Sequence, residues 1–256
     1  MKFISIVPTK FMKDAFLTSD TTLVLSHLVE KGNDYQKACL EFRKFGGKLI
    51  LDNSFYENMV NPPISILVKK AKLIEADILC LPDLPMSDHL QRDIATNINL
   101  VRGYGFYGKL MMCVWAQGKD WEEDLQFFKI LNSISNLDII AIPYCFGDRK
   151  KDEYKRPYFL DMIERSNIAI YKKIHLFGTP SWLDLKKSNR DWIDSIDGTL
   201  PWKVGYANKF LPVGTKKEPK RPKNYFDIES VGRNQKACIT YNCVTINKLL
   251  KGGNEK

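Results

Sequence analysis

The feature that most constrains the fold of this chain is a regular alternation of short apolar runs with longer amphipathic stretches. The apolar runs are rich in β-branched and aromatic residues, and each has the length of one buried strand. Eight segments have this pattern: residues 3–8, 22–29, 48–53, 77–83, 109–116, 138–144, 173–177 and 193–197. A chain with eight such segments is predicted to build a sheet of parallel strands.

The intervals between the apolar runs predict helices. Apolar residues recur with helical spacing over residues 34–45, 63–75, 87–103, 120–133, 152–166 and 181–188. Asp34, Ser87, Asp120 and Ser181 stand at the expected helix starts, where their side chains are favoured N-caps. Strand–helix alternation over 256 residues predicts a single-domain α/β protein, a (β/α)8 TIM barrel, and an open doubly wound sheet is the alternative.

The regular pattern weakens after Pro201. A basic, proline-containing stretch at residues 216–223 predicts an extended surface loop, and residues 232–250 predict a closing helix. We therefore expect a barrel over residues 1–205. Residues 206–256 should form a basic loop and a C-terminal helix that packs on that barrel.

Composition restricts the partners and cofactors. The chain has 39 Lys and Arg against 30 Asp and Glu, a net charge of +9, which favours a polyanionic partner. The apolar run near the N-terminus stops at Pro8, too short for a signal peptide or a membrane span, so we expect a soluble, cytoplasmic protein with no membrane partner. Cys238 and Cys243 have a spacing that fits zinc sites poorly, so we expect no metal and no cofactor.

Polar residues follow the predicted strands at one end. In a parallel barrel the carboxyl ends of all strands form one rim, where chemistry gathers. The residues expected at this rim are Asp52, Tyr56, Asp83, Gln117, Gly118, Tyr144, Asp148, Phe177, Gly178 and Asp197. Two carboxylates suit acid/base and nucleophilic chemistry at a sugar's anomeric carbon, and carboxylate, amide and aromatic groups suit a nucleobase. The rim therefore favours glycosyl transfer at a nucleotide.

The last predicted strand holds the candidate nucleophile. Side chains alternate along a strand, so Asp194 and Ile196 should face one way while Ser195 and Asp197 face the other. Gly198 and Pro201 are expected to end the strand and to leave Asp197 at its tip. A single such aspartate is usually a turn or cap residue. As one member of the rim set, Asp197 becomes the candidate nucleophile, and Asp194 is expected to be structural.

These segments resemble the tRNA-guanine transglycosylases. Asp52-Asn-Ser-Phe-Tyr56-Glu57 is similar to the family's Asp-Ser-Gly-Gly-(Phe/Tyr)-Gln, and Asp194-Ser-Ile-Asp197-Gly-Thr-Leu-Pro201-Trp-Lys203 resembles Asp-x-Phe-Asp-Cys-Val-Leu-Pro-Thr-Arg. Ala116-Gln117-Gly118 is similar to Val-Gln-Gly. The segments at 142–148 and 176–179 resemble Gly-Gly-Leu-Ala-Val-Gly-Glu and Leu-Met-Gly-Val-Gly. The matches run in the family's order over about residues 48–205.

The resemblance implies roles. Asp197 would attack the anomeric carbon, expel guanine and form a covalent glycosyl-enzyme, which makes the protein a pentosyltransferase. Asp52 would protonate the leaving guanine and deprotonate the incoming base. The base contacts would come from Tyr56, Asp83, Gln117, Gly118, Tyr144, Asp148, Phe177 and Gly178.

The chain also departs from the tRNA enzymes. Those carry a zinc subdomain after the nucleophile segment, whereas here only Cys238 and Cys243 follow it and all three His precede residue 176. The chain therefore looks most like the short, zinc-free DNA 7-deazaguanine transglycosylases of viruses and mobile elements, which implies DNA and a free preQ0-like base as partners, in the host cytoplasm if the protein is viral. A tRNA-guanine transglycosylase and a catalytically silent nucleic-acid-binding subunit are the alternatives.

Basic and aromatic residues near the rim are candidates for nucleic-acid contact. They are Arg149, Lys150, Lys151, Trp202, Lys203, Lys216, Lys217, Lys220, Arg221 and Lys223. Trp202 is either a core residue or a platform for a neighbouring base. His27 and His175 lie in apolar runs, so we expect them to be core or rim residues with satisfied hydrogen bonds.

Overall fold

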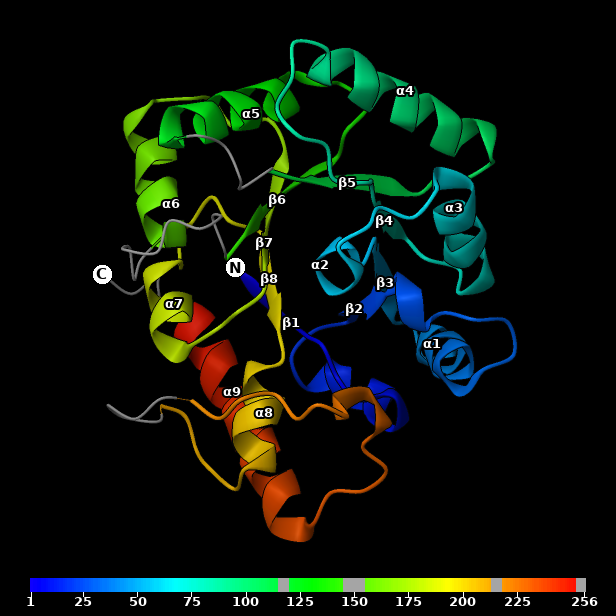
Figure 1. Ribbon diagram of the computed structural model, residues 1–256. Coiled ribbons are helices and arrows are strands. Elements are labelled where there is room, and N and C mark those ends of the chain that lie inside the picture. Colours follow the sequence, from blue (N-terminus) through cyan, green and yellow to red (C-terminus); the bar gives the residue numbers. More distant parts are fainter. Residues whose placement is uncertain (115–119, 145–154, 213–217, 252–256) are drawn as a thin grey trace.

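Eight parallel strands alternate with helices and form a nearly closed barrel, which confirms the predicted fold (Figure 1). This computed structural model describes residues 1–114, 120–144, 155–212 and 218–251. The strands are β1 (Lys2–Ser5), β2 (Thr21–Leu25), β3 (Lys48–Asp52), β4 (Ile78–Cys80), β5 (Lys109–Cys113), β6 (Ile139–Pro143), β7 (Lys173–Phe177) and β8 (Ser195–Gly198). In the sheet, β1 is followed by β8 and then by the other strands in descending order to β2.

The seam between β1 and β2 is bridged by side chains. The Thr22 hydroxyl donates to the carbonyl of Ser5 at 2.8 Å. The Thr18 hydroxyl donates to Ser5 Oγ at 2.9 Å. These bonds satisfy polar groups that the strand ladder leaves without partners at this point.

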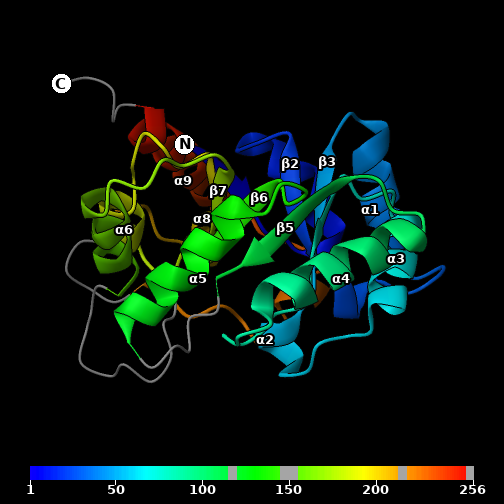
Figure 2. The ribbon, with the colours of Figure 1, turned by 90° about the horizontal axis from the view of Figure 1, so that it is seen from above.

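The helices surround the strands. They are α1 (Asp34–Lys44), α2 (Phe55–Asn58), α3 (Ile64–Leu73), α4 (Leu90–Gly103), α5 (Trp121–Ser133), α6 (Lys155–Arg165), α7 (Trp182–Lys187), α8 (Leu200–Tyr206) and α9 (Arg233–Lys251), with 3-10 helices η1 (Thr9–Leu17), η2 (Ser26–Leu28) and η3 (Tyr225–Asp227). The short α2 lies away from this ring, beyond the carboxyl end of β3 (Figure 2).

Several predicted boundaries are corrected. The strand expected at 22–29 ends at Leu25, because residues Ser26–Leu28 turn into η2. The N-cap of α1 is Asn33 instead of Asp34, and α4 begins after His89 instead of at Ser87. Asp120 and Ser181 cap α5 and α7 as predicted, each accepting a hydrogen bond from the amide three residues later.

The strands are buried on both faces, which explains their almost continuous apolar sequences. Along β3, Leu49 and Leu51 pack in the layer between sheet and helices, while Ile50 points into the barrel. The barrel interior is filled by Ile4, Leu23, Leu25, Ile50, Cys80, Met111, Ile139 and Ala141. Burying each large aliphatic side chain stabilises the fold by roughly 1.5–3 kcal/mol.

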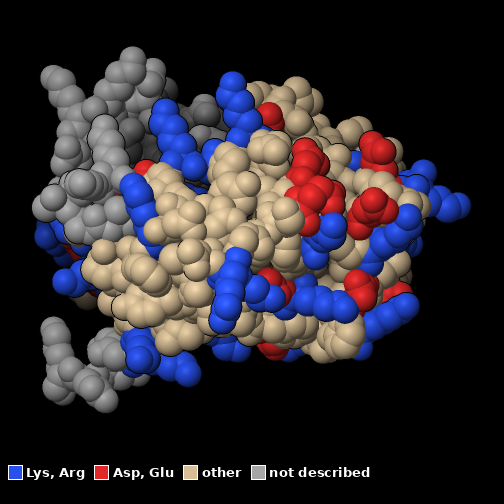
Figure 3. Space-filling view, turned by 90° about the horizontal axis from the view of Figure 1, so that it is seen from below, with Lys and Arg blue, Asp and Glu red and all other residues tan. Residues whose placement is uncertain are grey.

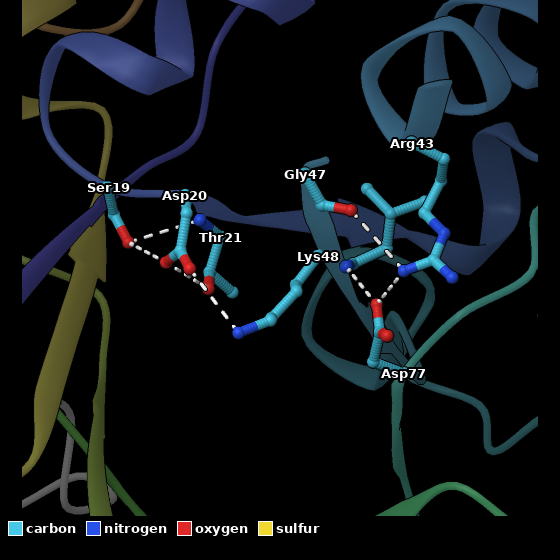
Figure 4. A network of polar contacts seen from close by, with 8 residues as sticks. Ser19, Asp20, Thr21, Arg43, Gly47, Lys48 and Asp77 are labelled. Carbon is cyan, nitrogen blue, oxygen red and sulfur yellow. Dashed lines mark hydrogen bonds and ion pairs between the residues drawn. The ribbon is translucent and has the colours of Figure 1, made fainter. Parts of the chain in front are cut away.

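The amino ends of the strands are fixed by three aspartates. Asp77, Asp138 and Asp194 directly precede β4, β6 and β8. Each accepts a hydrogen bond from the backbone amide of a residue in the preceding strand. The donors are Leu49 at 2.8 Å, Leu110 at 2.8 Å and Ile174 at 2.9 Å. Asp77 also receives Nη1 of Arg43 at 2.5 Å (Figure 4). Asp194 therefore has a structural role at the end opposite the rim.

The C-terminal helix packs closely on α8. A Cβ at Gly205 of α8 would lie 2.5 Å from a side-chain carbon of Ile239, so only glycine allows the two helices to approach this far. The buried side chain of Asn242 accepts the Leu211 amide at 2.8 Å and donates to the carbonyl of Lys209 at 3.1 Å. Cys238 and Cys243 are buried in the same helix as free thiols. A bilayer-spanning helix needs about 20 apolar residues, and none of the helices in the described ranges qualifies.

The aspartates at the amino end can be tested through stability. We predict that Asp77→Ala lowers the free energy of unfolding by roughly 1–2 kcal/mol, because the Leu49 amide and the Arg43 guanidinium lose a charged acceptor. Urea unfolding followed by circular dichroism measures the change. The control is Asp191→Ala, which alters an exposed residue in the turn before β8. Equal stability of the two variants would contradict the role of Asp77.

Candidate active site

The carboxyl ends of the strands surround a cavity of about 620 Å³. Four acidic residues line it: Asp52 at the end of β3, Glu57 in α2, Asp83 after β4 and Asp197 in β8. Tyr144, Phe177 and Gly178 contribute to its wall, together with apolar residues such as Leu23 and Val114. The cavity therefore combines apolar walls with a group of acidic side chains, the composition expected of a small-molecule site.

Asp197 is buried and held from two sides. The residue is 2% exposed. Its Oδ2 lies 2.9 Å from Nε2 of His175, and its Oδ1 accepts the amide of Gly178 at 2.8 Å. A buried carboxylate is tolerated when hydrogen-bond donors of this kind surround it.

His175 is in turn oriented by Ser195. Its Nδ1 lies 2.8 Å from the Ser195 hydroxyl, and in the β7–β8 register the two residues are direct partners. Because an ionised carboxylate can only accept, Nε2 of His175 carries the proton shared with Asp197. The sequence interpretation of His175 as a buried residue with satisfied hydrogen bonds is correct, but it did not identify Asp197 as the partner. The alternation of side chains along the two neighbouring strands could have identified it. Ser195 and Asp197 face the same side of β8, and His175 lies opposite Ser195 on β7.

The pKa of Asp52 is shifted upward by its surroundings. Burial raises the pKa of its carboxyl well above the ordinary value, and the charges of Glu57, Asp83 and Asp197 raise it further. The amide of Ser54, which donates to Asp52 Oδ2 at 3.0 Å, opposes this rise. Asp52 is therefore the acidic residue of the cavity most inclined to keep its proton.

The pKa of Asp83 is raised for a similar reason. Burial brings the pKa of its carboxyl from 3.8 to about 6, against a hydrogen bond from Asn53 that lowers it. The Asp83 backbone is fixed by Asn61, whose Oδ1 accepts the Asp83 amide at 2.9 Å and whose Nδ2 donates to the Asp83 carbonyl at 2.7 Å. The pKa of Glu57 is also raised, first by desolvation.

Two cations line the same cavity. Nζ of Lys203 donates to the carbonyl of Pro180 at 2.8 Å, and partial burial lowers the pKa of this amine. The guanidinium of Arg221 lies 5.9 Å from the ring centre of Tyr225 and 5.6 Å from that of Phe226. Arg221, Lys220 and Lys223 are exposed. The C-terminal loop thus brings the positive charge of Arg221 to the cavity, and nucleic-acid contact by this loop stays a prediction.

The prediction that Trp202 could stack on a base is wrong. β8 ends at Gly198, and Pro201 lies in the first turn of α8 instead of marking the end of a strand. Trp202 is consequently turned into the core, where it is fully buried and its ring centre lies 5.3 Å from that of Phe11. A side chain in that position cannot meet a nucleobase.

Gly178 is required by its surroundings. Its φ is +72°, a conformation that glycine tolerates best, and a Cβ there would lie 2.6 Å from the ring of Tyr144. Glycine at this position therefore allows the ring of Tyr144 to pack against the backbone whose amide donates to Asp197.

Other predicted site residues lie outside what the structure describes. These are Gln117, Gly118, Asp148, Arg149, Lys150, Lys151, Lys216 and Lys217, together with the side chain of Tyr56. Over the described ranges, no three His, Cys, Asp or Glu side chains form a group that could hold a metal ion.

Comparison with known proteins gives no match. No protein-family model matches the chain, and no curated protein matches it. The chemistry of the cavity therefore has to carry any functional conclusion.

The raised pKa of Asp83 makes a prediction about stability. The native carboxyl holds its proton up to about pH 6, whereas the unfolded one loses it near pH 3.8, so stability falls as the pH rises between these values. Asp83→Asn removes this penalty and should raise the free energy of unfolding at pH 8 by roughly 2–3 kcal/mol, with a smaller gain at pH 4.5. Urea unfolding at both values measures the gain. Asp88→Asn, at an exposed position, is the control, and a pH-independent gain would refute the prediction.

Proposed function

We propose that this protein is a DNA guanine transglycosylase, which exchanges guanine for a 7-deazaguanine through a covalent glycosyl-aspartate. Asp197 is the nucleophile and Asp52 the general acid and base. The observation that carries the proposal is that one cavity holds a carboxyl fixed by two donors and a second carboxyl whose pKa is raised. Asp197 accepts hydrogen bonds from His175 and from the Gly178 amide, while burial and neighbouring carboxylates raise the pKa of Asp52. Retaining transfer at an anomeric carbon needs one ionised and one protonated acid.

The first half-reaction uses both states. An oxygen of Asp197 forms a bond to C1′ of the nucleotide while the C1′–N9 bond breaks and its electron pair moves to the guanine. Asp52 gives its proton to the departing base and becomes a carboxylate. The hydrogen bonds from His175 and the Gly178 amide hold the attacking group in place.

The second half-reaction reverses these movements with a different base. The carboxylate of Asp52 takes the N9 proton of the incoming 7-deazaguanine, N9 forms the new bond to C1′, and Asp197 leaves as a carboxylate. The bonds from His175 and Gly178 stabilise the charge that returns to Asp197. Two inversions at C1′ give net retention, and both carboxyls end in their starting states.

The remaining lining suits a purine. Tyr144 and Phe177 offer aromatic surface, and Asp83 offers a carboxyl that can accept from, or when protonated donate to, a base edge. Lys203 and Arg221 add positive charge beside the acidic group, where the phosphates of the reacting strand would lie. The net charge of +9 supports binding to a nucleic acid through counterion release.

An exchange assay tests the proposal. Wild type should release labelled guanine from duplex DNA when a 7-deazaguanine is supplied, and Asp197→Asn should lower the rate at least about 10³-fold, because the amide cannot form the ester. DNA binding, measured by fluorescence anisotropy, should survive this change. Asp191→Asn is the control. Exchange on tRNA and not on DNA would select the tRNA enzyme, and full exchange by Asp197→Asn would refute the mechanism.

The hydrogen bond of His175 makes a separate prediction. His175→Leu removes the donor to Asp197 and should lower kcat by about 10–100-fold with little change in KM, because the nucleophile loses its orientation. His175→Gln can place an amide N–H near the position of Nε2 and should recover part of the loss. Circular dichroism checks that both variants fold. Equal kcat values for the two variants would contradict the positioning role.

A further inference from the structure

The loop between α2 and α3 carries an exposed apolar pair at the mouth of the cavity. Met59 and Val60, the apolar tip, are 65% and 66% exposed, and Met59 also lines the cavity that contains Asp197. Other strongly exposed large hydrophobic residues, such as Tyr107 and Tyr171, lie in loops that lead into strands, at the opposite end of the barrel. The tip therefore exposes apolar surface at the place where a substrate enters.

The apolar tip is held in place. Met59 adopts the left-handed conformation with a φ of 55°, which is unfavourable for a residue with a side chain, and its amide donates to the Phe55 carbonyl at 2.6 Å. Directly after the tip, Asn61 makes its two hydrogen bonds to the backbone of Asp83, and Pro62 and Pro63 lead into α3. These bonds fix the tip relative to the acidic residues of the cavity.

Positive charge lies on the wall of the cavity that Met59 borders. Arg221 lines the same cavity and interacts electrostatically with Glu57, two residues before Met59. Burial lowers the pKa of His27, which follows β2, and the charges of Lys70 and Arg221 lower it further. Figure 3 shows one face of the molecule, on which Lys and Arg side chains are spread between broad uncharged areas, as expected from the net charge of +9. An apolar projection beside the guanidinium of Arg221 is complementary to stacked bases between phosphates.

We propose that the apolar tip is a wedge that enters the base stack of duplex DNA when the target guanine turns into the cavity. Extruding a base from a duplex leaves a gap and costs stacking and pairing energy. Side chains such as Met and Val can fill a gap of this kind by inserting between base steps. Because Met59 borders the cavity, the tip lies next to the position that the extruded base leaves. This inference rests on the proposed function.

The test compares duplex with single-stranded DNA of the same sequence. The double variant Met59→Ser/Val60→Ser should exchange guanine in duplex DNA at least about tenfold more slowly than wild type, and in single-stranded DNA at a rate within about twofold, because a single strand has no stack to open. A 2-aminopurine next to the target guanine should brighten on binding wild type and remain quenched with the variant. Val244→Ser, at a 46% exposed position on α9 outside the cavity lining, is the control.

The outcomes separate the two proposals. Equal rates of wild type and double variant on duplex DNA would overturn the wedge and leave the transglycosylase intact. An equal loss on both substrates would also overturn it, since the tip would then serve general substrate binding. A wild-type dimer that the double variant dissociates, seen by sedimentation, would assign the tip to a second copy of the chain. Absence of exchange by wild type on either DNA would refute the proposed function itself.

Discussion

The hydrogen bond between His175 and Asp197 determines the character of the whole cavity. It exists because β7 and β8 are paired in parallel with His175 opposite Ser195, which brings the ring beside Asp197 two residues further along β8. Ser195 and the Gly178 amide complete the set, so that a carboxylate buried in the barrel has a donor on each oxygen. Burial and the charge of Glu57 raise the pKa of Asp52, and Asp197 adds to this rise. One strand register thus places a firmly held carboxyl in the same cavity as a carboxyl whose pKa is raised.

The two ends of the barrel use aspartates for opposite purposes. At the amino end, Asp77, Asp138 and Asp194 accept backbone amides and strengthen the sheet. At the carboxyl end, burial raises the pKa values of Asp52 and Asp83, and neighbouring carboxylates raise that of Asp52 further, which weakens the fold near neutral pH. Stability lost at one end of a barrel and gained at the other is the arrangement expected when the carboxyl end carries function.

Much of this architecture could be predicted from the sequence, because apolar runs of strand length recur eight times and several of them are followed by polar residues. Contacts that depend on register or on distant segments could not. His175 carried only a signal of burial. Pro201 is predicted to end a strand but lies in the first turn of α8, and α2 follows the left-handed Ser54, which no local pattern indicates. The basic loop predicts Arg221 as a candidate for nucleic-acid contact but not its place in the cavity lining, because this loop lies beyond the barrel and has no regular periodicity.

The proposed covalent bond between Asp197 and the substrate is tested most directly by intact-protein mass spectrometry. Wild-type protein would be mixed with a short guanine-containing duplex, quenched in acid during turnover and digested for peptide mapping. The proposed chemistry predicts a protein carrying one oligonucleotide, depleted of one guanine and attached through Asp197. An unmodified protein during active exchange, or an adduct at any other residue, would contradict it.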